Sequence, residues 1–311
     1  MSVISIIVCT YNRAKELNGF LERLESHVLN SKLDADIVLV DNNSSDNTPT
    51  VLSCFEANTK LKVTIAQEKM QGANFARNTG IRNARSQLLV FTDDDVGFSD
   101  TWLIDFLKYM DAHPKCQVAT GYISPMFLKP RPKWLDDSML NIYGQQDYGE
   151  KPIDLQFPNF PVEMNMVIRA IVFERYGNFS TEFSRDDKTL MSNDGKSFFY
   201  KLSHHNTTVK YIPNAKLFHL IPDSRIKPEW VMRRFFWQGV SDIAFQDLIN
   251  KEAKTSGVFK SLIDLIKLLN IMRGKSISPK KIYWHWHALP VKLKATHAYK
   301  LGILFRKLGW K

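Results

Sequence analysis

Short apolar runs alternate with longer amphipathic stretches along the first 120 residues of the chain. The apolar runs are rich in β-branched residues, have the length of strands, and lie at 3–9, 36–40, 61–66, 87–92 and 117–121. Between them, apolar residues recur at helical spacing over 14–29, 48–55, 72–84 and 100–112. Strands that alternate with helices in this way predict an α/β fold, with a parallel sheet covered by helices on both faces.

The second part of the chain, 121–250, has a less regular pattern. Prolines are frequent over 122–161, where Trp134, Tyr143 and Tyr148 also lie, and a loop of this length in a compact domain usually serves function. Further patterns predict strands near 162–169, 207–212 and 216–220, and helices near 170–176, 193–202 and 229–250.

The positive charge of the chain is concentrated in its last part. The formal net charge is +10, and 14 of the 42 basic residues but only two of the 32 acidic residues lie in 251–311. This tail has an interrupted apolar stripe over 255–272, and Tyr283, Trp284, Trp286 and Trp310 lie among its lysines. No run reaches the roughly 18 uncharged residues of a membrane span. The pattern predicts a basic amphipathic helical tail on an anionic membrane surface. A helical appendage that packs on the main domain is the alternative.

The cysteines and the N-terminal apolar run indicate the cellular compartment of the protein. Cys9, Cys54 and Cys116 lie far apart and form no Cys-x-x-Cys pattern, so we expect neither a disulfide framework nor a zinc site. The first apolar run has no basic segment before it and is typical of a strand rather than a signal peptide. Together with the tail, these features predict a cytoplasmic protein that is peripheral on the inner face of the membrane.

Polar side chains follow three of the predicted strands at the point where each strand ends. Residues 10–13 (Thr-Tyr-Asn-Arg) follow the first strand, Asp41 follows the second, and Asp93-Asp94-Asp95 follow the fourth. Parallel α/β sheets bind their ligands at this edge. Three adjacent carboxylates repel one another and need a positive partner, and hard oxygen ligands suit Mn²⁺ or Mg²⁺. A solvated acidic turn before the helix near Asp100 is the simpler alternative.

Four blocks of sequence follow one another in a characteristic order. They are VISIIVCTYNR over 3–13, IVLVDNNSSD over 37–46, GANFARNTGIRNA over 72–84 and LLVFTDDD over 88–95. Together they resemble the family-two glycosyltransferases, which have the GT-A fold. Weaker matches extend the resemblance to about residue 245, at 163–166, 177–179, 192–194, Pro213, His219, Arg234 and 238–239.

The resemblance implies a domain organisation. A GT-A domain over 1–250 would have a mostly parallel central sheet flanked by helices. Its nucleotide-binding half would be 1–120 and its acceptor half 121–250, where the loop over 122–161 is suited to acceptor recognition or to closing over the donor. The basic helical tail over 251–311 lies outside the resemblance.

The resemblance also implies a donor pocket for a nucleotide-sugar. Thr10, Tyr11 and Arg13 would line its base and diphosphate side, Asp41 would accept a hydrogen bond from the base, which is uracil in most relatives, and Arg77 would face the diphosphate. Two simpler readings stay open at this point: Tyr11 packs against the helix that follows it, and Arg77 is a solvated helix residue.

The same resemblance assigns the acidic cluster. Asp93 would lie toward the ribose, Asp95 would ligate the metal, Mn²⁺ or Mg²⁺, and Asp94 would take one of these two roles. His219 would be a further metal ligand, although a single histidine after a strand is commonly a structural imidazole.

The catalytic base is where the sequence departs from the family. Inverting relatives carry two acids at the start of the helix after the Gly-x-Phe turn, and the second acid deprotonates the acceptor. Here that place holds Asp194 followed by Gly195. We expect Asp194 to be the base, with Asp186 and Asp187 as the nearest other carboxylates. Impaired activity and a plain helix cap at Asp194 are the alternatives.

The predicted function is inverting sugar transfer. The donor would be a nucleotide-diphosphate sugar, most simply a UDP-sugar, and the acceptor a saccharide or a lipid-linked saccharide in polysaccharide or glycolipid assembly. A catalytically silent relative that binds or scaffolds, and a basic protein that binds nucleic acid, are the competing classes. We expect no nucleic-acid partner, because that class leaves the acidic strand ends unexplained. A dehalogenase-type phosphatase would need an aspartate after the first strand, where Thr10 stands.

Overall fold

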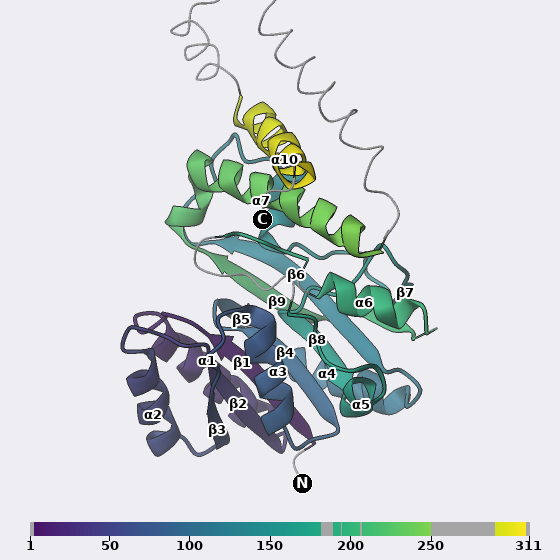
Figure 1. Cartoon of the computed structure of the whole chain (residues 1–311). Coiled ribbons are helices and arrows are strands. Elements are labelled where there is room, and N and C mark those ends of the chain that lie inside the picture. Colours follow the sequence, from purple (N-terminus) through teal and green to yellow (C-terminus); the bar gives the residue numbers. More distant parts are fainter. Residues whose placement is uncertain (1–2, 182–188, 194, 206, 250–289, 309–311) are drawn as a thin grey trace, which may run out of the picture. The chain divides into compact units, whose positions relative to one another are not determined.

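The computed structural model describes residues 3–181, 189–193, 195–205, 207–249 and 290–308 (Figure 1). The chain divides into two compact units. The sheet unit comprises Met1–Met126, Tyr143–Arg185 and Asp194–Ile221, and the helical unit comprises Phe127–Ile142, Asp186–Asn193 and Pro222–Lys311. The boundary expected near residue 250 falls outside the described residues and stays a prediction.

The first half of the sheet is parallel, as the strand and helix alternation predicted. Its strands run in the order β3-β2-β1-β4, with bounds Lys62–Gln67, Ala35–Asp41, Ile4–Thr10 and Leu88–Asp93. In the register, Thr10 pairs with Asp41 and Cys9 pairs with Asp93. The polar ends of three strands therefore meet at one edge of the sheet.

The second half of the sheet is antiparallel where its pairing is described. It adds β8 (Asn165–Arg169), β6 (Val118–Phe127), β9 (Val209–Ile221), β5 (Val96–Phe98) and the short β7 (Ile153–Leu155). The run at 117–121, which we expected to continue the parallel set, belongs to β6 and pairs antiparallel with β8. β6 runs in the same direction as β4, because each is antiparallel to β8, but it does not pair with the parallel strands, since β8, far along the chain, inserts between β4 and β6.

The two strands expected at 207–212 and 216–220 are one strand, β9. β7 pairs with Val209–Tyr211 and β5 pairs with Leu217–His219. Pro213 lies between these two paired segments, so its missing N–H does not interrupt either of them.

Helices cover both faces of the sheet. They are α1 (Leu17–Ser31), α2 (Thr48–Asn58), α3 (Ala73–Asn83), α4 (Trp102–Ala112), α5 (Ala170–Tyr176) and α6 (Lys196–Ser203). Successive strand residues face opposite cores: Ile6 packs with α1 and α4, whereas Ile7 packs with α3, α5 and α6. Gly80 of α3 lies so close to Ile7 that a Cβ would overlap it. Strands β1, β2 and β4 are thus buried on both sides, which explains their nearly continuous apolar runs, whereas the edge strand β3 is only partly buried.

The helical unit contains two long helices, α7 (Pro228–Ile249) and α10 (Val291–Lys307), and short 3₁₀ turns at Asp137–Tyr143 and Asp223–Ile226. The two helices lie in close contact at Gly302, since a Cβ added to this glycine would be only 2.9 Å from the carbonyl carbon of Phe236. Tyr299 donates a hydrogen bond of 2.9 Å to Asp242 across this contact. Within the described ranges, no helix has both the length and the apolar character that crossing a bilayer requires.

Candidate active site

The loops after β1 and β2 are joined by hydrogen bonds from Asn12. This residue has a φ of 50°, a left-handed conformation that asparagine adopts more readily than most residues. Its N–H donates to Ser44 Oγ at 2.9 Å, and its side-chain Oδ1 accepts the N–H of Ser45 at 2.8 Å. The N–H of Arg13 donates to Thr48 Oγ1 at 2.9 Å. These bonds fix the loop that carries Tyr11 and Arg13.

The end of β2 is buried and polar. Asp41 is only 3% exposed, and its Oδ1 accepts the N–H of Ser44 at 3.2 Å. Asn42 donates to the Met70 carbonyl at 2.7 Å and accepts the N–H of Gly72 at 2.8 Å. Asn42 therefore ties the end of β2 to the loop before α3.

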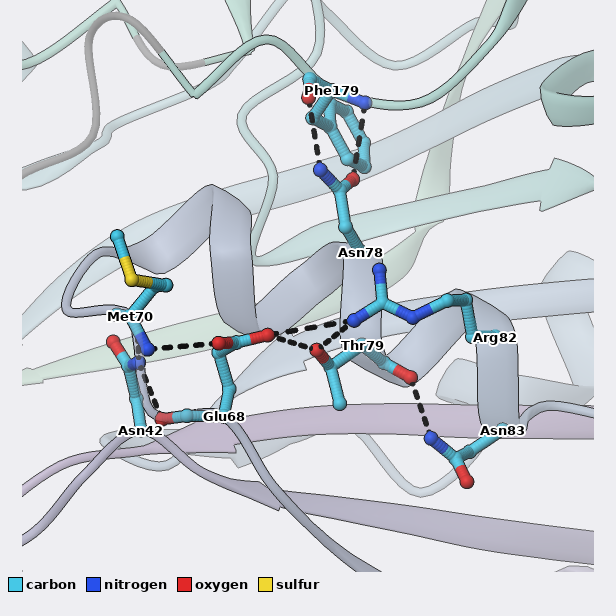
Figure 2. A network of polar contacts seen from close by, with 8 residues as sticks. All are labelled: Asn42, Glu68, Met70, Asn78, Thr79, Arg82, Asn83 and Phe179. Carbon is cyan, nitrogen blue, oxygen red and sulfur yellow. Dashed lines mark hydrogen bonds and ion pairs between the residues drawn. The ribbon is translucent and has the colours of Figure 1, made fainter.

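A second network holds the same loop against α3 (Figure 2). Glu68 accepts the N–H of Met70 at 2.8 Å, and its other oxygen accepts hydrogen bonds from Thr79 and Arg82. Partial burial acts against ionisation, but these hydrogen bonds and the Arg82 charge outweigh it and lower the pKa of Glu68. The charged Glu68 side chain thus holds the loop that precedes α3 against this helix.

One face of α3 carries the polar residues of the third sequence block. Arg77 is 9% exposed, donates to Asn74 Oδ1 at 3.0 Å and lies 3.8 Å from Asp93 Oδ1. Asn78 exchanges two hydrogen bonds with the backbone of Phe179, at 2.9 and 3.1 Å (Figure 2). The reading of Arg77 as a solvated residue is therefore wrong. Through these contacts, α3 connects Asp93 at the end of β4 to the turn at 177–179.

The three aspartates after β4 turn toward three different partners. Asp93 faces Arg77, Asp94 accepts a hydrogen bond of 2.6 Å from Thr10, and Asp95 Oδ2 lies 3.4 Å from His219 Nε2. Arg13 Nε also lies 3.4 Å from Asp94. The side chains of Asp94 and Asp95 are each 12% exposed. Asp94 and Asp95 are therefore too buried to belong to a solvated acidic turn, the alternative that the sequence left open.

Burial and mutual repulsion both oppose ionisation of the acidic cluster. Burial raises the pKa of Asp94 to about 7, against the opposing charge of Arg13. Burial also raises the pKa of Asp93, against the opposing charge of Arg77, and Asp95 adds to the rise at both positions. A bound cation would relieve this repulsion.

His219 is oriented by a second contact. It is 6% exposed on β9, opposite Val96 of β5, and its Nδ1 lies 2.6 Å from the Tyr143 carbonyl oxygen. Because a carbonyl only accepts, this contact assigns a proton to Nδ1 and leaves Nε2 to face Asp95. A metal-binding histidine is commonly oriented by such a bond on its other nitrogen.

This donor set fits a divalent cation that also binds phosphate. A carboxylate oxygen and an imidazole nitrogen face each other at 3.4 Å. Within the described part of the chain, no three His, Cys, Asp or Glu side chains gather as a complete metal site. A cation at Asp95 and His219 would need further oxygen ligands, which a diphosphate and water can provide.

The remaining predicted site residues are placed as follows. Tyr11 is half-buried in the loop after β1. Asp194, Asp186 and Asp187 lie outside the described residues, so the predicted base stays a prediction. Tyr143 is 1% exposed, and the rings of Tyr148 and Tyr211 pack edge-on with their centroids 5.3 Å apart.

Asn165 is a buried polar residue to which the sequence patterns assign no role. Its Oδ1 accepts the indole N–H of Trp102 at 2.8 Å, and its Nδ2 donates to the carbonyls of Tyr122 and Ala215, each at 2.9 Å. It sits opposite Thr92 at the end of β4. The sequence feature that could have indicated this role is a polar asparagine at the start of an otherwise apolar strand.

Comparison with known proteins agrees with this geometry. The family model described as glycosyl transferase family 2 matches residues 5–176. The glucosyl-dolichyl phosphate glucuronosyltransferase of Haloferax volcanii is 20% identical over 241 residues, which cover 76% of this chain and 75% of that protein.

Two solved glycosyltransferases share the fold. The Pyrobaculum calidifontis mannosyltransferase PcManGT, in complex with GDP-Man and Mn²⁺, has a TM-score of 0.63 and 18% identity over 99% of this chain and 87% of its own. S. aureus TarS in complex with UDP has a TM-score of 0.56 and 15% identity over 99% of this chain and 92% of its own. The chain belongs to glycosyl transferase family 2 and has the GT-A fold that its four sequence blocks predicted.

Proposed function

We propose that this glycosyltransferase moves a sugar from a UDP-sugar to an acceptor hydroxyl, with inversion, and that Asp95 and His219 hold a divalent cation against the donor diphosphate. The approach of Asp95 Oδ2 to His219 Nε2 at 3.4 Å supports this most directly. These residues are 124 positions apart in the sequence and meet at the strand edge where the family binds its donor.

The donor is proposed to lie along the ends of β1, β2 and β4. Asp41 would accept a hydrogen bond from the base, since a carboxylate that accepts one N–H from Ser44 has further lone pairs. Thr10, Tyr11 and Arg13 would line the base and diphosphate side. Asp93 would lie toward the ribose, and Asp94, which is bonded to Thr10 and close to Arg13, would hold these two residues in place.

The leaving group is a diphosphate, so positive charge must be present where its negative charge develops. A bound Mn²⁺ or Mg²⁺ would supply charge neutralisation at this point. Arg77 would add a fixed guanidinium, which its hydrogen bond to Asn74 holds in position before the donor arrives. Preorganised charge of this kind commonly contributes several kcal/mol, on the order of 3, to lowering a barrier.

Screening a panel of UDP- and GDP-sugars by calorimetry, with and without Mn²⁺, tests the proposed donor. We expect one UDP-sugar to bind tightly only with the metal, and to release UDP when an acceptor is added. Preference for a GDP-sugar would replace the proposed base. Donor binding without any turnover would favour the silent relative. The absence of metal-dependent affinity for every donor would contradict the proposal.

We further propose that the acceptor is a saccharide or lipid-linked saccharide at a membrane surface, with the tail as the contact. The name of the Haloferax volcanii relative specifies a lipid-linked sugar. In the described part of the tail, α10 exposes Leu293 and Leu301 beside Lys292 and Lys300. Apolar residues interleaved with lysines suit the surface of an anionic bilayer.

Co-sedimentation with vesicles measures this contact. The full chain is expected to bind vesicles that contain anionic lipid, to bind neutral vesicles at least tenfold more weakly, and to dissociate as salt rises, because exposed charges are screened. Truncation after residue 250 should abolish binding. Equal recovery of the full and truncated chains in the supernatant of anionic vesicles at low salt would contradict this contact.

A further inference from the structure

Gly195 occupies the position where the family resemblance places the second acid of the catalytic pair. It caps α6 and has φ −82° and ψ −17°, an ordinary backbone conformation that any residue can adopt. The reason for the glycine is space. A Cβ at this position would lie 2.7 Å from Cδ and 2.9 Å from Cγ of Glu163, closer than real atoms approach. The carboxyl group of Glu163 fills the place of the missing side chain.

Glu163 reaches this place from a different element. It precedes β8 by two residues, and the first residue of β8, Asn165, pairs with Thr92 immediately before the acidic cluster. Glu163 therefore lies at the same edge of the sheet as Asp93, and its charge contributes to the electrostatic environment of Asp93. The site has a carboxylate here although the position in the sequence that normally carries it is a glycine.

The surroundings of Glu163 hold its backbone but leave its carboxylate available. The N–H of Val162 donates to Gln146 Oε1 at 3.0 Å, and the N–H of Asn165 donates to the Val162 carbonyl at 3.1 Å. The side chain of Glu163 is half-buried, and among the residues that the structure describes it has no hydrogen-bond or ion-pair partner. A half-buried carboxylate with unused lone pairs is suited to accept a proton from a bound hydroxyl.

We propose that Glu163 is the general base of the transfer reaction, in place of the acid that the family carries at position 195. In the step, a Glu163 oxygen takes the proton of the acceptor hydroxyl as the acceptor oxygen forms its bond to the anomeric carbon. The bond from that carbon to the diphosphate oxygen breaks, and the nucleoside diphosphate leaves with the electron pair. Glu163 ends the step protonated and returns its proton to water.

This inference rests on the proposed function, and it replaces Asp194 as the expected base. The two assignments make opposite predictions for two isosteric variants. Glu163→Gln should retain Mn²⁺-dependent binding of the UDP-sugar within about twofold but lower kcat by about 10²–10⁴, the usual contribution of a general base. Asp194→Asn should transfer sugar at least tenfold faster than Glu163→Gln. Calorimetry and a coupled UDP-release assay measure the two quantities separately.

The pH profile separates a base from a structural residue. Wild-type kcat should fall on the acidic side as the base becomes protonated, and this limb should disappear in the residual activity of Glu163→Gln. A residue that acts only through packing would lower activity without removing the limb.

Moving the carboxylate gives a gain-of-function test. Gly195→Asp alone should lose activity, because the new side chain overlaps Glu163. Glu163→Ala empties the space, and Gly195→Asp in that background restores a carboxylate at the position that family members use. We expect the double variant to transfer sugar at least tenfold faster than Glu163→Ala.

Three results would overturn the assignment. The first is that Glu163→Gln transfers sugar within threefold of wild type. The second is that Glu163→Gln loses donor binding as much as it loses transfer, and the third is that Asp194→Asn loses transfer while Glu163→Gln retains it. A wild-type protein without metal-dependent donor affinity would instead overturn the proposed function itself, which the same calorimetry detects before any variant is made.

Discussion

Asp95→Asn is expected to lower sugar transfer by a factor on the order of 10³ and to remove most of the Mn²⁺ dependence of donor binding. The substitution keeps the size and shape of a side chain that is 12% exposed, and it removes only the charge that faces His219 Nε2 at 3.4 Å. A neutral amide is a much poorer ligand for a hard cation than a carboxylate. The effect should therefore appear as lost metal affinity, measured by Mn²⁺ titration calorimetry in the presence of UDP.

The matched control is Asp111→Asn, which makes the same chemical change at an exposed position of α4 in the same unit. This variant should bind Mn²⁺ and transfer sugar as the wild type does. His219→Ala should resemble Asp95→Asn, because both side chains are proposed to hold one cation. Wild-type Mn²⁺ affinity in either variant would contradict the assignment of that residue as a ligand.

Asn165→Ala is expected to have the largest effect on stability, a loss of about 3–6 kcal/mol in the free energy of unfolding. Asn165 is fully buried and bonds the Trp102 indole and two backbone carbonyls. Removing the carboxamide takes a hydrogen-bond partner from the indole N–H and from two carbonyls, and a buried polar group left without a partner costs about 1–3 kcal/mol. Domains are typically stable by only about 5–15 kcal/mol, so this loss is a large part of the total.

Urea denaturation followed by tryptophan fluorescence measures this loss as a lower transition midpoint. Asn18→Ala is the control, since Asn18 is exposed and its side chain donates a hydrogen bond to Glu22 on the same helix. It should cost less than about 0.5 kcal/mol. A loss below about 1 kcal/mol for Asn165→Ala would show that the buried network does not stabilise this end of the sheet as the contacts indicate.

The parallel half of the sheet could be predicted because its signals are local. Each of the first four strands is an apolar run of five to seven residues followed by polar residues, and the register that aligns Thr10 with Asp41 follows from parallel pairing. The acidic cluster was found for the same reason, since it directly follows β4. Its division among three partners could not be predicted, because Arg77, Arg13 and His219 come from three separate elements.

The second half of the fold is non-local, and local patterns described it less well. The pairing of β6 depends on β8, which enters the sheet between β4 and β6 and runs antiparallel to both. The role of Glu163 depends on its contact with the space beside Gly195, 32 positions further along the chain. Resemblance identified the missing acid at 195, but only the three-dimensional arrangement shows which side chain fills its place.

The most direct test of the account is to locate the metal. In a crystal of the protein grown with UDP and Mn²⁺, anomalous diffraction should show one manganese ion at about 2.0–2.3 Å from both Asp95 Oδ2 and His219 Nε2, with the diphosphate oxygens completing its coordination. Bound UDP with no anomalous peak between these two side chains, or a peak on other residues, would contradict the central claim.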